Sequence, residues 1–263
     1  MSDLIALTAG HLTRDRYPEG DEPGGGVWYV AHAWRALKVA SRAVTAADPA
    51  DVPARWPGEV AVQASGRTTT FCNTYGPTGR AMRLDAQAPP VVVSSVPAEW
   101  RRCDVLLLAP VAAELDPERW LAAIECRWSG AGLQGWLKAR TADGRFVPRP
   151  SGLDPRALAG LGVACLSDED LGDDRAWLDG LRAVVPLVVL THGAAGCTVF
   201  AGGDATRVAA AKAVEVDPTG AGDTFAAALM VNLADGFGPV MAATRAGELA
   251  ARCVERRGPV GGM

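Results

Sequence analysis

The segment Asp217–Phe225 constrains the fold of this chain more than any other part of its sequence. It reads Asp-Pro-Thr-Gly-Ala-Gly-Asp-Thr-Phe, follows an apolar run with Val214 and Val216, and precedes the Ala/Leu/Met-rich run 226–233. This order predicts a strand, a glycine turn and the start of a helix. Glycines let main-chain N–H groups converge without interference from Cβ atoms, and a helix N-terminus favours negative charge. The segment therefore predicts an anion site with the Asp223 carboxylate beside it, which suits phosphoryl transfer to a hydroxyl.

Two other interpretations of this glycine turn were weighed. A dinucleotide-binding fingerprint follows an early strand, needs a third glycine or alanine, and is followed about 20 residues later by an acidic residue. Here Phe225 occupies the third position and the motif lies late in the chain. A Walker A loop is excluded, because no Gly-Lys-Ser/Thr follows any glycine loop. The remaining alternative is a plain strand–helix turn in which Asp223 is an acidic residue of the first helical turn.

The rest of the chain alternates short apolar runs with amphipathic ones. Residues 16–23 are polar, contain two prolines, and are predicted to form a loop; residues 132–137 are ambiguous between a strand edge and a loop. Buried strands separated by helices predict an α/β fold with a doubly wound, mostly parallel sheet and helices on both faces. Strands are expected at 4–9, 60–62, 68–73, 80–84, 105–108, 163–166, 187–191, 197–200 and just before 217, and helices at 27–40, 117–127, 155–161, 174–184, from 222, and at 239–256.

Size and charge limit the classes of function. A chain of 263 residues fits one large domain over 1–263. The net charge of −4 argues against nucleic acid or an anionic membrane as a partner. No apolar run reaches the roughly 18 residues of a spanning helix, and the first residues lack the pattern of a signal peptide. Six scattered cysteines without a Cys-x-x-Cys pair read as reduced thiols, so a cytoplasmic protein is expected.

The segment from Asp217 to Asp223 resembles the Asp-Thr-x-Gly-Ala-Gly-Asp motif of the ribokinase-like, or phosphofructokinase-B-type (PfkB), carbohydrate kinases, with Pro218 in place of a residue that is often Thr. The resemblance extends from Gly10 to about Arg256. It implies an enzyme that transfers the γ-phosphoryl group of ATP to a hydroxyl of a sugar, an inositol-like polyol or a nucleoside. It further implies that Asp223 is the general base. The transferring group would be held by the main-chain amides of Gly220, Ala221 and Gly222.

Two further motifs resemble parts of the same family that handle the nucleotide and its metal. Thr191–Gly196 resembles a Thr-Lys/Leu-Gly-x-x-Gly element that lies along the nucleotide, which implicates Thr191, Gly193 and Gly196 in ATP binding. A strand-to-hairpin turn is the alternative. Ser167–Asp170 resembles an Asn-x-x-Glu motif, which implies that Asp170 and Asp168 hold Mg²⁺ through water. The alternative is an N-cap serine followed by first-turn acids.

The acceptor side is implied by two more segments. Asp15 matches the family's acid that binds sugar hydroxyls, and Gly25 and Gly26 match its di-glycine hinge. Residues 133–138 resemble the Gln-Gly-x-Leu-Arg stretch of an inositol-kinase-like branch, so Gln134 is a candidate for contact with the substrate. The alternatives are a surface aspartate on a flexible loop and a packing turn with a core tryptophan. Only eight residues separate Asp15 from Gly24, so a reduced β lid formed within 60–85 is expected.

Two other classes of function were kept open. One is a catalytically weak regulatory protein of the same fold that binds a nucleotide or a sugar. The other is a dinucleotide-dependent oxidoreductase. In either kinase-like case the expected partner is a small molecule, and the protein is expected to be a monomer or a homodimer.

Overall fold

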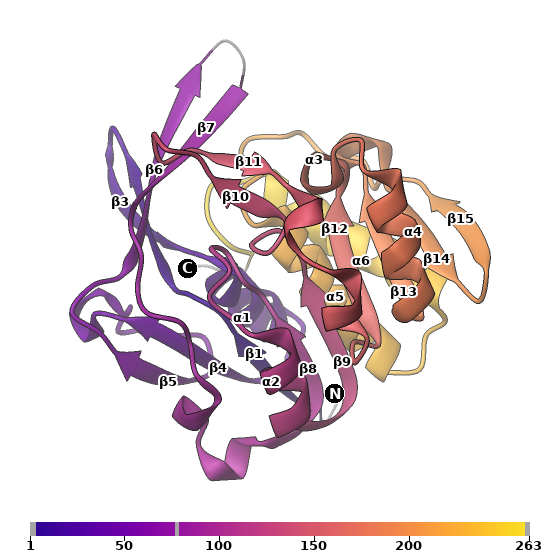
Figure 1. The fold of residues 1–263 in the computed structure, drawn as a ribbon, viewed down its shortest axis with the longest axis horizontal. Helices are drawn as coiled ribbons and strands as arrows, with labels where there is room; N and C mark the ends of the chain where they lie inside the picture. Colours follow the sequence, from indigo (N-terminus) through magenta and orange to yellow (C-terminus); the bar gives the residue numbers. More distant parts are fainter. Residues whose placement is uncertain (1–3, 77–78, 261–263) are drawn as a thin grey trace.

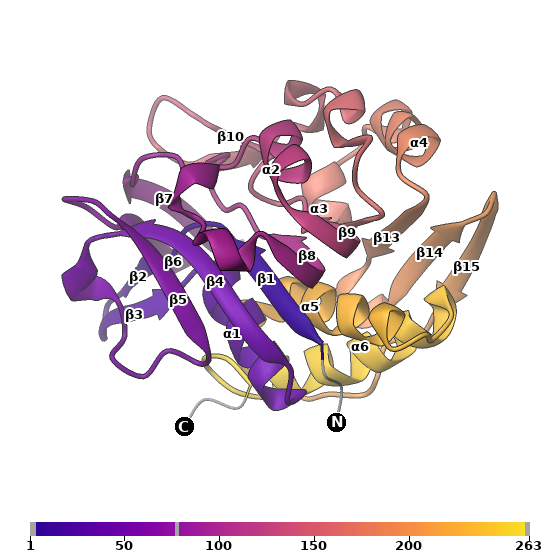
Figure 2. The same ribbon diagram turned by 90° about the horizontal axis from the view of Figure 1, so that it is seen from below.

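The large sheet forms the body of the molecule (Figures 1 and 2). The computed structural model describes residues 4–76 and 79–260, and among these nine strands join in the order β15-β14-β13-β12-β9-β8-β1-β4-β5. All pairings from β13 to β5 are parallel, whereas β13, β14 and β15 form an antiparallel meander. The predicted doubly wound α/β fold is thereby confirmed. The strands are β1 (Ile5–Ala9), β4 (Ala40–Ala47), β5 (Glu59–Ala64), β8 (Arg102–Leu108), β9 (Glu125–Gly132), β12 (Val163–Ser167), β13 (Leu187–Thr191), β14 (Cys197–Ala201) and β15 (Asp204–Val208).

Helices cover both faces of this sheet. Side chains along each strand alternate between two hydrophobic cores, so that Ala6 and Val105 contact one core and Leu7 and Leu106 the other. Figure 2 shows α1, α5 and α6 on one side of the sheet and α2 and α4 on the other. Because the strands are buried on both faces, they read as continuous apolar runs. The helices are α1 (Gly26–Ala36), α2 (Pro117–Ala123), α3 (Asp168–Leu171), α4 (Arg175–Val184), α5 (Ala221–Ala234) and α6 (Pro239–Val254).

The lid is a separate four-stranded sheet of order β3-β2-β6-β7, with strands β2 (Thr13–Tyr17), β3 (Gly20–Gly24), β6 (Thr69–Gly76) and β7 (Gly79–Ala86). Two expectations about it were wrong. Residues 16–23 form most of a hairpin rather than a loop, and 60–62 belong to β5 of the large sheet. The polar hairpin is stabilised by main-chain pairing of β2 with both β3 and β6. Pro23 is tolerated because β3 lies at the edge of its sheet.

A small ribbon joins the lid to the body. Strands β10 (Lys138–Arg140) and β11 (Phe146–Pro148) pair in antiparallel fashion. The ring of Phe146 packs edge-on against Phe71 of β6 at 5.7 Å, and Leu84 N–H of β7 donates to Gly144 O at 3.0 Å. In Figure 1 this ribbon lies beside β7. The lid is therefore held by the turn end of this ribbon, where Phe146 pairs with Arg140, the last residue of β10.

Several element boundaries differ from the expected ones. The helix predicted over 27–40 ends at Ala36, and the one predicted over 117–127 ends at Ala123, in each case because a strand that was not predicted follows. In β9 the missing signal has a physical origin. A Cβ atom at Gly130 would lie 2.5 Å from Met230 Sδ, so the absence of a side chain there lets Met230 of α5 pack closely on the strand. The predicted helix at 155–161 is a short 3₁₀ turn over Pro155–Leu158.

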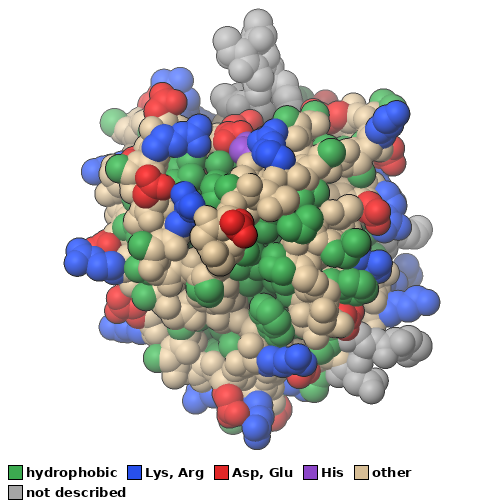
Figure 3. Space-filling view, turned by 90° about the vertical axis from the view of Figure 1, so that its right-hand side faces the viewer, with side chains coloured by type: hydrophobic (Ala, Val, Ile, Leu, Met, Phe, Trp, Pro, Cys, Tyr) green, Lys and Arg blue, Asp and Glu red, His purple; other side chains and the backbone are tan. Residues whose placement is uncertain are grey.

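The strand expected just before Asp217 is absent from the described structure. Residues 209–216 form an irregular segment in which Val214 and Val216 are 77% and 64% exposed. Figure 3 shows hydrophobic side chains across the centre of the face at the β15 end of the molecule, with charged side chains mostly around them. Within residues 4–76 and 79–260, no helix is long and apolar enough to cross a membrane.

Candidate active site

The start of α5 faces the start of α1 at the carboxyl ends of the parallel strands. Asp223 lies in the first turn of α5. A Cβ atom built on Gly26 would lie 3.1 Å from Asp223 Oδ1, and one built on Gly132 would lie 4.0 Å from the same atom. The di-glycine turn, the end of β9 and the catalytic motif, which are far apart in the sequence, thus converge on one carboxylate. Open α/β sheets bind ligands at this edge.

The environment of Asp223 favours its protonated form. Burial raises the pKa of this carboxyl to about 7, the negative charge of Asp170 contributes to the rise, and the ammonium of Lys138 opposes it. The residue as a whole is nevertheless partly accessible to solvent. A carboxyl with a pKa near the pH at which it works can both accept and return a proton. Perturbed pKa values of this kind are concentrated at functional sites.

The glycine turn that precedes α5 has a fixed shape. Gly220 adopts a left-handed conformation with φ of 76°, and a Cβ atom there would lie 2.0 Å from the ring of Tyr29. Ala221 N–H donates to Pro218 O at 3.2 Å, and Thr224 N–H donates to Gly220 O at 2.9 Å. Within the described residues, no main-chain acceptor pairs with the N–H of Gly222 or of Asp223, the usual free donors of a first turn. No acceptor in the described structure pairs with the N–H of Gly220 either, so of the three amides of the predicted cradle only that of Ala221 is already engaged.

Lys138 is a site residue that the sequence analysis did not select. It begins β10, and its Nζ lies 3.3 Å from Asp170 Oδ1, with both side chains largely buried. The signal was present, because this lysine occupies the Arg position of the stretch that Gln134 begins. Lys138 forms an ion pair with Asp170 and also acts electrostatically on Asp223, so these carboxylates match its single positive charge. An ammonium group can bind a phosphate, which makes Lys138 the candidate cation of this site.

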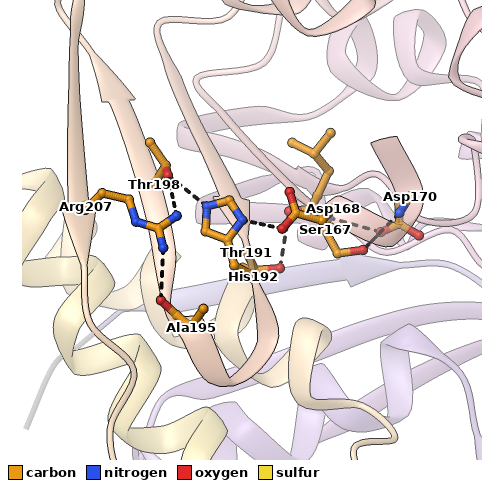
Figure 4. A network of polar contacts seen from close by, with 9 residues as sticks. Ser167, Asp168, Asp170, Thr191, His192, Ala195, Thr198 and Arg207 are labelled. Atoms are coloured by element: carbon orange, nitrogen blue, oxygen red, sulfur yellow. Dashed lines mark hydrogen bonds and ion pairs between the residues drawn. The ribbon is translucent and has the colours of Figure 1, made fainter. Parts of the chain in front are cut away.

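Asp170 is held by its own helix start. Ser167 caps α3, with its N–H and its hydroxyl donating to Asp170 Oδ2 at 3.2 and 2.7 Å, so the predicted N-cap alternative describes the local geometry (Figure 4). Asp170 Oδ1 is buried and makes no hydrogen bond within the described structure apart from its ion pair with Lys138. This oxygen fits a role in holding a hydrated Mg²⁺. Asp168 does not fit as well, because it is bonded to His192.

The segment predicted to bind the nucleotide, Thr191–Gly196, makes most of its side-chain hydrogen bonds with neighbouring strands and with Asp168. Thr191 Oγ1 donates to Leu166 O at 3.3 Å, and His192 bridges Asp168 to Thr198, whose Oγ1 lies 2.8 Å from its Nε2 (Figure 4). Gly196 is required by packing, because a Cβ atom there would lie 2.0 Å from Val208 O. Gly193 has no neighbour within 4 Å of its added Cβ, so its surface is open.

The predicted acceptor residues lie at the hinge of the lid. Asp15 is buried in β2 and accepts a hydrogen bond from Thr13 Oγ1 at 2.8 Å. A Cβ atom at Gly24 would lie 2.4 Å from Asp15 Oδ2, which places this carboxylate against the turn that continues into Gly25 and Gly26. Gln134 is exposed just beyond β9, whereas its neighbour Trp136 is buried and donates to Leu115 O at 2.9 Å.

Glu114 supports these loops and carried no recognisable sequence signal. It is buried, and its carboxylate accepts N–H bonds from His11 at 2.8 Å, from Val111 at 3.0 Å and from Ala112 at 2.7 Å. These donors follow β1 and β8. Glu114 thereby joins the ends of two central strands beside the di-glycine turn, and its acceptors satisfy amides that would otherwise be buried without partners.

The fold is that of the ribokinase type, an α/β body with a β lid. The model of the pfkB family carbohydrate kinases matches residues 164–263, which run from β12 through α6. The suspected resemblance is thereby confirmed for the part of the chain that contains the Asp223 motif. No curated protein sequence matches the chain.

Solved structures extend the likeness to the whole chain. A pyrophosphate-dependent kinase in the ribokinase family, complexed with a pyrophosphate analog and myo-inositol, is 22% identical, with 97% of each chain covered and a TM-score of 0.81. Ribokinase from Thermotoga maritima is 17% identical over 97% of this chain and 94% of its own, with a TM-score of 0.70. Arabidopsis thaliana ribokinase complexed with ribose and ATP is 16% identical over 98% and 95%, with a TM-score of 0.71. These similarities establish the fold.

Proposed function

We propose that this protein transfers a phosphoryl group from a phosphorylated donor to a hydroxyl group of a small polyol, sugar or nucleoside. The observation that carries the proposal is the carboxylate of Asp223. It lies between Gly26 and Gly132 at the start of a helix, and its pKa is raised to about 7. The match of residues 164–263 to a family of carbohydrate kinases supports the same class of reaction.

In the proposed step, Asp223 accepts the proton of the acceptor hydroxyl while the oxygen attacks the terminal phosphorus of the donor. The bond between that phosphorus and the bridging oxygen breaks, and the remainder of the donor leaves with the bonding electrons. The N–H groups of Gly222 and Asp223 and the ammonium of Lys138 stabilise the negative charge on the transferring group. The cycle ends when the proton leaves Asp223 for solvent.

Magnesium is assigned to Asp170 in this proposal. Its buried Oδ1 would hold the hydrated ion, which would supply positive charge next to the donor phosphates. Lys138 contributes the same sign of charge from the protein itself. The positive charges of the ion and of Lys138 would offset the negative charge of Asp170, so this carboxylate would not repel the donor phosphates.

The acceptor that we favour is an inositol-like polyol. Gln134 belongs to a stretch that resembles the inositol-kinase-like branch, and a structure of this fold with a TM-score of 0.81 was solved with myo-inositol. Asp15 and the Gly25–Gly26 turn would orient the acceptor, since a carboxylate accepts hydrogen bonds from two neighbouring hydroxyls. Ribose-like sugars and nucleosides are the other acceptors to be tested.

Two donors are supported by different observations. ATP is the donor implied by the Thr191–Gly196 element, and the exposed side chains of Val214 and Val216 offer an apolar surface for a base near the glycine turn. Pyrophosphate is supported by the structural likeness to a pyrophosphate-dependent kinase. His192 also makes its hydrogen bonds within the protein, to Asp168 and Thr198, rather than presenting a free cation to a nucleotide.

The direct test combines both donors with an acceptor panel. Purified protein with Mg²⁺ is incubated with ATP or pyrophosphate and with myo-inositol, ribose, fructose or a nucleoside, and phosphate esters are followed by ³¹P NMR. A new ester in one combination identifies both substrates. Binding of donor and acceptor without any ester would favour the regulatory alternative. Hydride transfer with NAD would favour the oxidoreductase and exclude the proposal.

A further inference from the structure

A second pocket lies at the opposite end of α1 from Asp223. It has a volume of about 580 Å³ and is formed by the last turn of α1, the first residues of β4 and residues 55–58. Ala40 of β4 pairs with Ile5, the first residue of β1. Because the strands are parallel, the pocket lies at the amino edge of the sheet, whereas Gly26 and Asp223 lie at the carboxyl edge.

The rim of this pocket is positively charged. Arg35, Lys38 and Arg55 are exposed on it, and none of the three takes part in an ion pair with another described residue. Within the described part of the chain, no acidic side chain lines the pocket. Three unpaired cations therefore gather on a protein whose net charge is −4. Such a concentration attracts anions and not cations.

The backbone at Lys38 is strained. Lys38 has a φ of 61° just beyond the C-terminus of α1. Glycine is the usual residue in this left-handed position, because a Cβ atom is disfavoured there. Lys38 thus adopts a backbone conformation that favours glycine. Its side chain lines the pocket.

The indole of Trp56 links the rim to a cluster of buried nitrogen atoms. Its ring contacts Trp28 at 5.4 Å, and Trp28 contacts His32 at 4.3 Å. Trp28 Nε1, Trp56 Nε1 and both ring nitrogens of His32 are buried without a hydrogen-bond partner in the described structure. An indole N–H can only donate. Of these three residues only Trp56 lines the pocket, so its indole ring is the group that would sense a ligand bound there.

The wall of the pocket is preformed. Ser41 Oγ donates to Pro57 O at 2.8 Å, and a Cβ atom at Gly58 would lie 2.2 Å from Ser41 Oγ. The segment 55–58 is thus held tightly against the start of β4. A ligand entering the pocket would not have to order this loop, so little binding energy would be lost.

We infer that this pocket binds a small phosphorylated anion. A phosphate group carries up to two negative charges and several acceptor oxygens, which matches the two guanidinium groups and the one ammonium on the rim. The volume is in the range of sites for small metabolites. The inference does not depend on the kinase proposal, because it uses none of the residues around Asp223.

The test observes Trp56 directly. The protein is labelled with 5-fluorotryptophan, the Trp56 resonance is assigned from its loss in Trp56→Phe, and inorganic phosphate and pyrophosphate are titrated at constant ionic strength with chloride as the reference anion. We expect a saturable shift of the Trp56 resonance. The variant Arg35→Gln/Arg55→Gln should bind at least tenfold more weakly, with unchanged turnover at saturating substrates. Lys212→Gln/Arg252→Gln removes two exposed cations elsewhere and should bind like the native protein.

Two outcomes would overturn the inference. One is a Trp56 resonance that neither anion moves beyond the shift caused by chloride. The other is an equal affinity in the native protein and in Arg35→Gln/Arg55→Gln, which would place the bound anion elsewhere. If Trp56→Phe does not fold, the resonance whose shift is lost in the double arginine variant serves as the reporter in its place.

Discussion

The portion over residues 164–263 and the portion that precedes it build the candidate site in different ways. The later portion supplies chemical groups in short motifs: Asp170 in a capping box, His192 in a polar network, and Asp223 after a glycine turn. The earlier portion supplies mainly shape, since Gly26 and Gly132 leave room for the carboxylate and Glu114 holds the supporting loops together, and it adds one charged group, Lys138. The match to the model of the pfkB family carbohydrate kinases covers this later portion, residues 164–263.

The largest effect should come from removing the base. Asp223→Asn is expected to reduce kcat by about a hundredfold or more, because general bases contribute about 10²–10⁴ in rate. Folding should improve rather than suffer. The pKa of Asp223 is raised from 3.8 to about 7 on folding, so the charged carboxyl destabilises the native state increasingly as the pH rises between these values. The measurements are steady-state kinetics, and Tm at pH 5 and pH 8.

In the native enzyme, kcat should fall as the pH drops below about 7, since the base becomes protonated. Asp223→Asn should lose this dependence and should gain more in Tm at pH 8 than at pH 5. Native turnover in this variant would show that the base lies elsewhere.

The next effect concerns charge from the earlier portion of the chain. Lys138→Met should lower kcat by about tenfold to a hundredfold, because it removes a cation from the transferring group. Lys138 also lowers the pKa of Asp223, so its removal should move the acidic limb of the pH profile to higher pH. Lys138→Arg, which keeps the charge, is the matched control and should retain most of the activity. If the pH profile of kcat did not move in Lys138→Met, the inferred electrostatic interaction of Lys138 with Asp223 would be contradicted.

A shape effect should follow from Gly26→Ala. The added methyl group would lie 2.7 Å from Ala109 Cβ and 3.1 Å from Asp223 Oδ1. We expect a loss of about 1–3 kcal/mol in the free energy of unfolding and about tenfold in kcat, since small misplacements of reacting groups are costly. Gly247→Ala in α6 meets nothing within 4 Å and serves as the control. It should gain about 0.5–1 kcal/mol in stability, with unchanged kinetics.

The smallest effect is expected on the donor side. Asp168→Asn and His192→Asn each break an exposed contact of the network in Figure 4. Interactions of this kind contribute about 1 kcal/mol or less. Each variant should therefore raise the KM for the donor by no more than about fivefold, with kcat almost unchanged. A loss of kcat comparable with that of Lys138→Met would mean that Asp168 takes part in metal binding after all.

Much of the body of the fold could be predicted from the sequence, because its strands and helices have distinct apolar patterns. Strand β9 was missed because glycines weaken its strand signal; Gly130 makes room for Met230 of α5, and Gly132 lies at the end of the strand near Asp223. The hairpin of β2 and β3 was missed because main-chain pairing with β6, a strand distant in sequence, overrides its polar composition. Pairing with a distant strand cannot be read from the residues of the hairpin alone.

The candidate site was predictable where chemistry and motif coincide, as for Asp223. Glu114 was not selected, because its importance follows from three amides that only the fold brings to it. Lys138 was overlooked although it occupies the Arg position of the stretch that Gln134 begins, and its pairing with Asp170 is visible only in the structure. The left-handed turn at Gly220 is a further example. Its tight contact with Tyr29 depends on how α1 lies against α5, which the local sequence does not encode.

Helix α1 begins at Gly26, beside the reactive carboxylate, and ends next to Lys38, on the cationic rim. An 11-residue helix is about 16 Å long and behaves as a stiff rod. Tilting it by about 4° around its far end would displace its near end by about 1 Å, a distance that can alter a reaction rate considerably. A ligand held by Arg35 and Arg55 would therefore bind at one end of the same helix whose other end lies beside Asp223, so that any tilt it caused would reach the carboxylate directly.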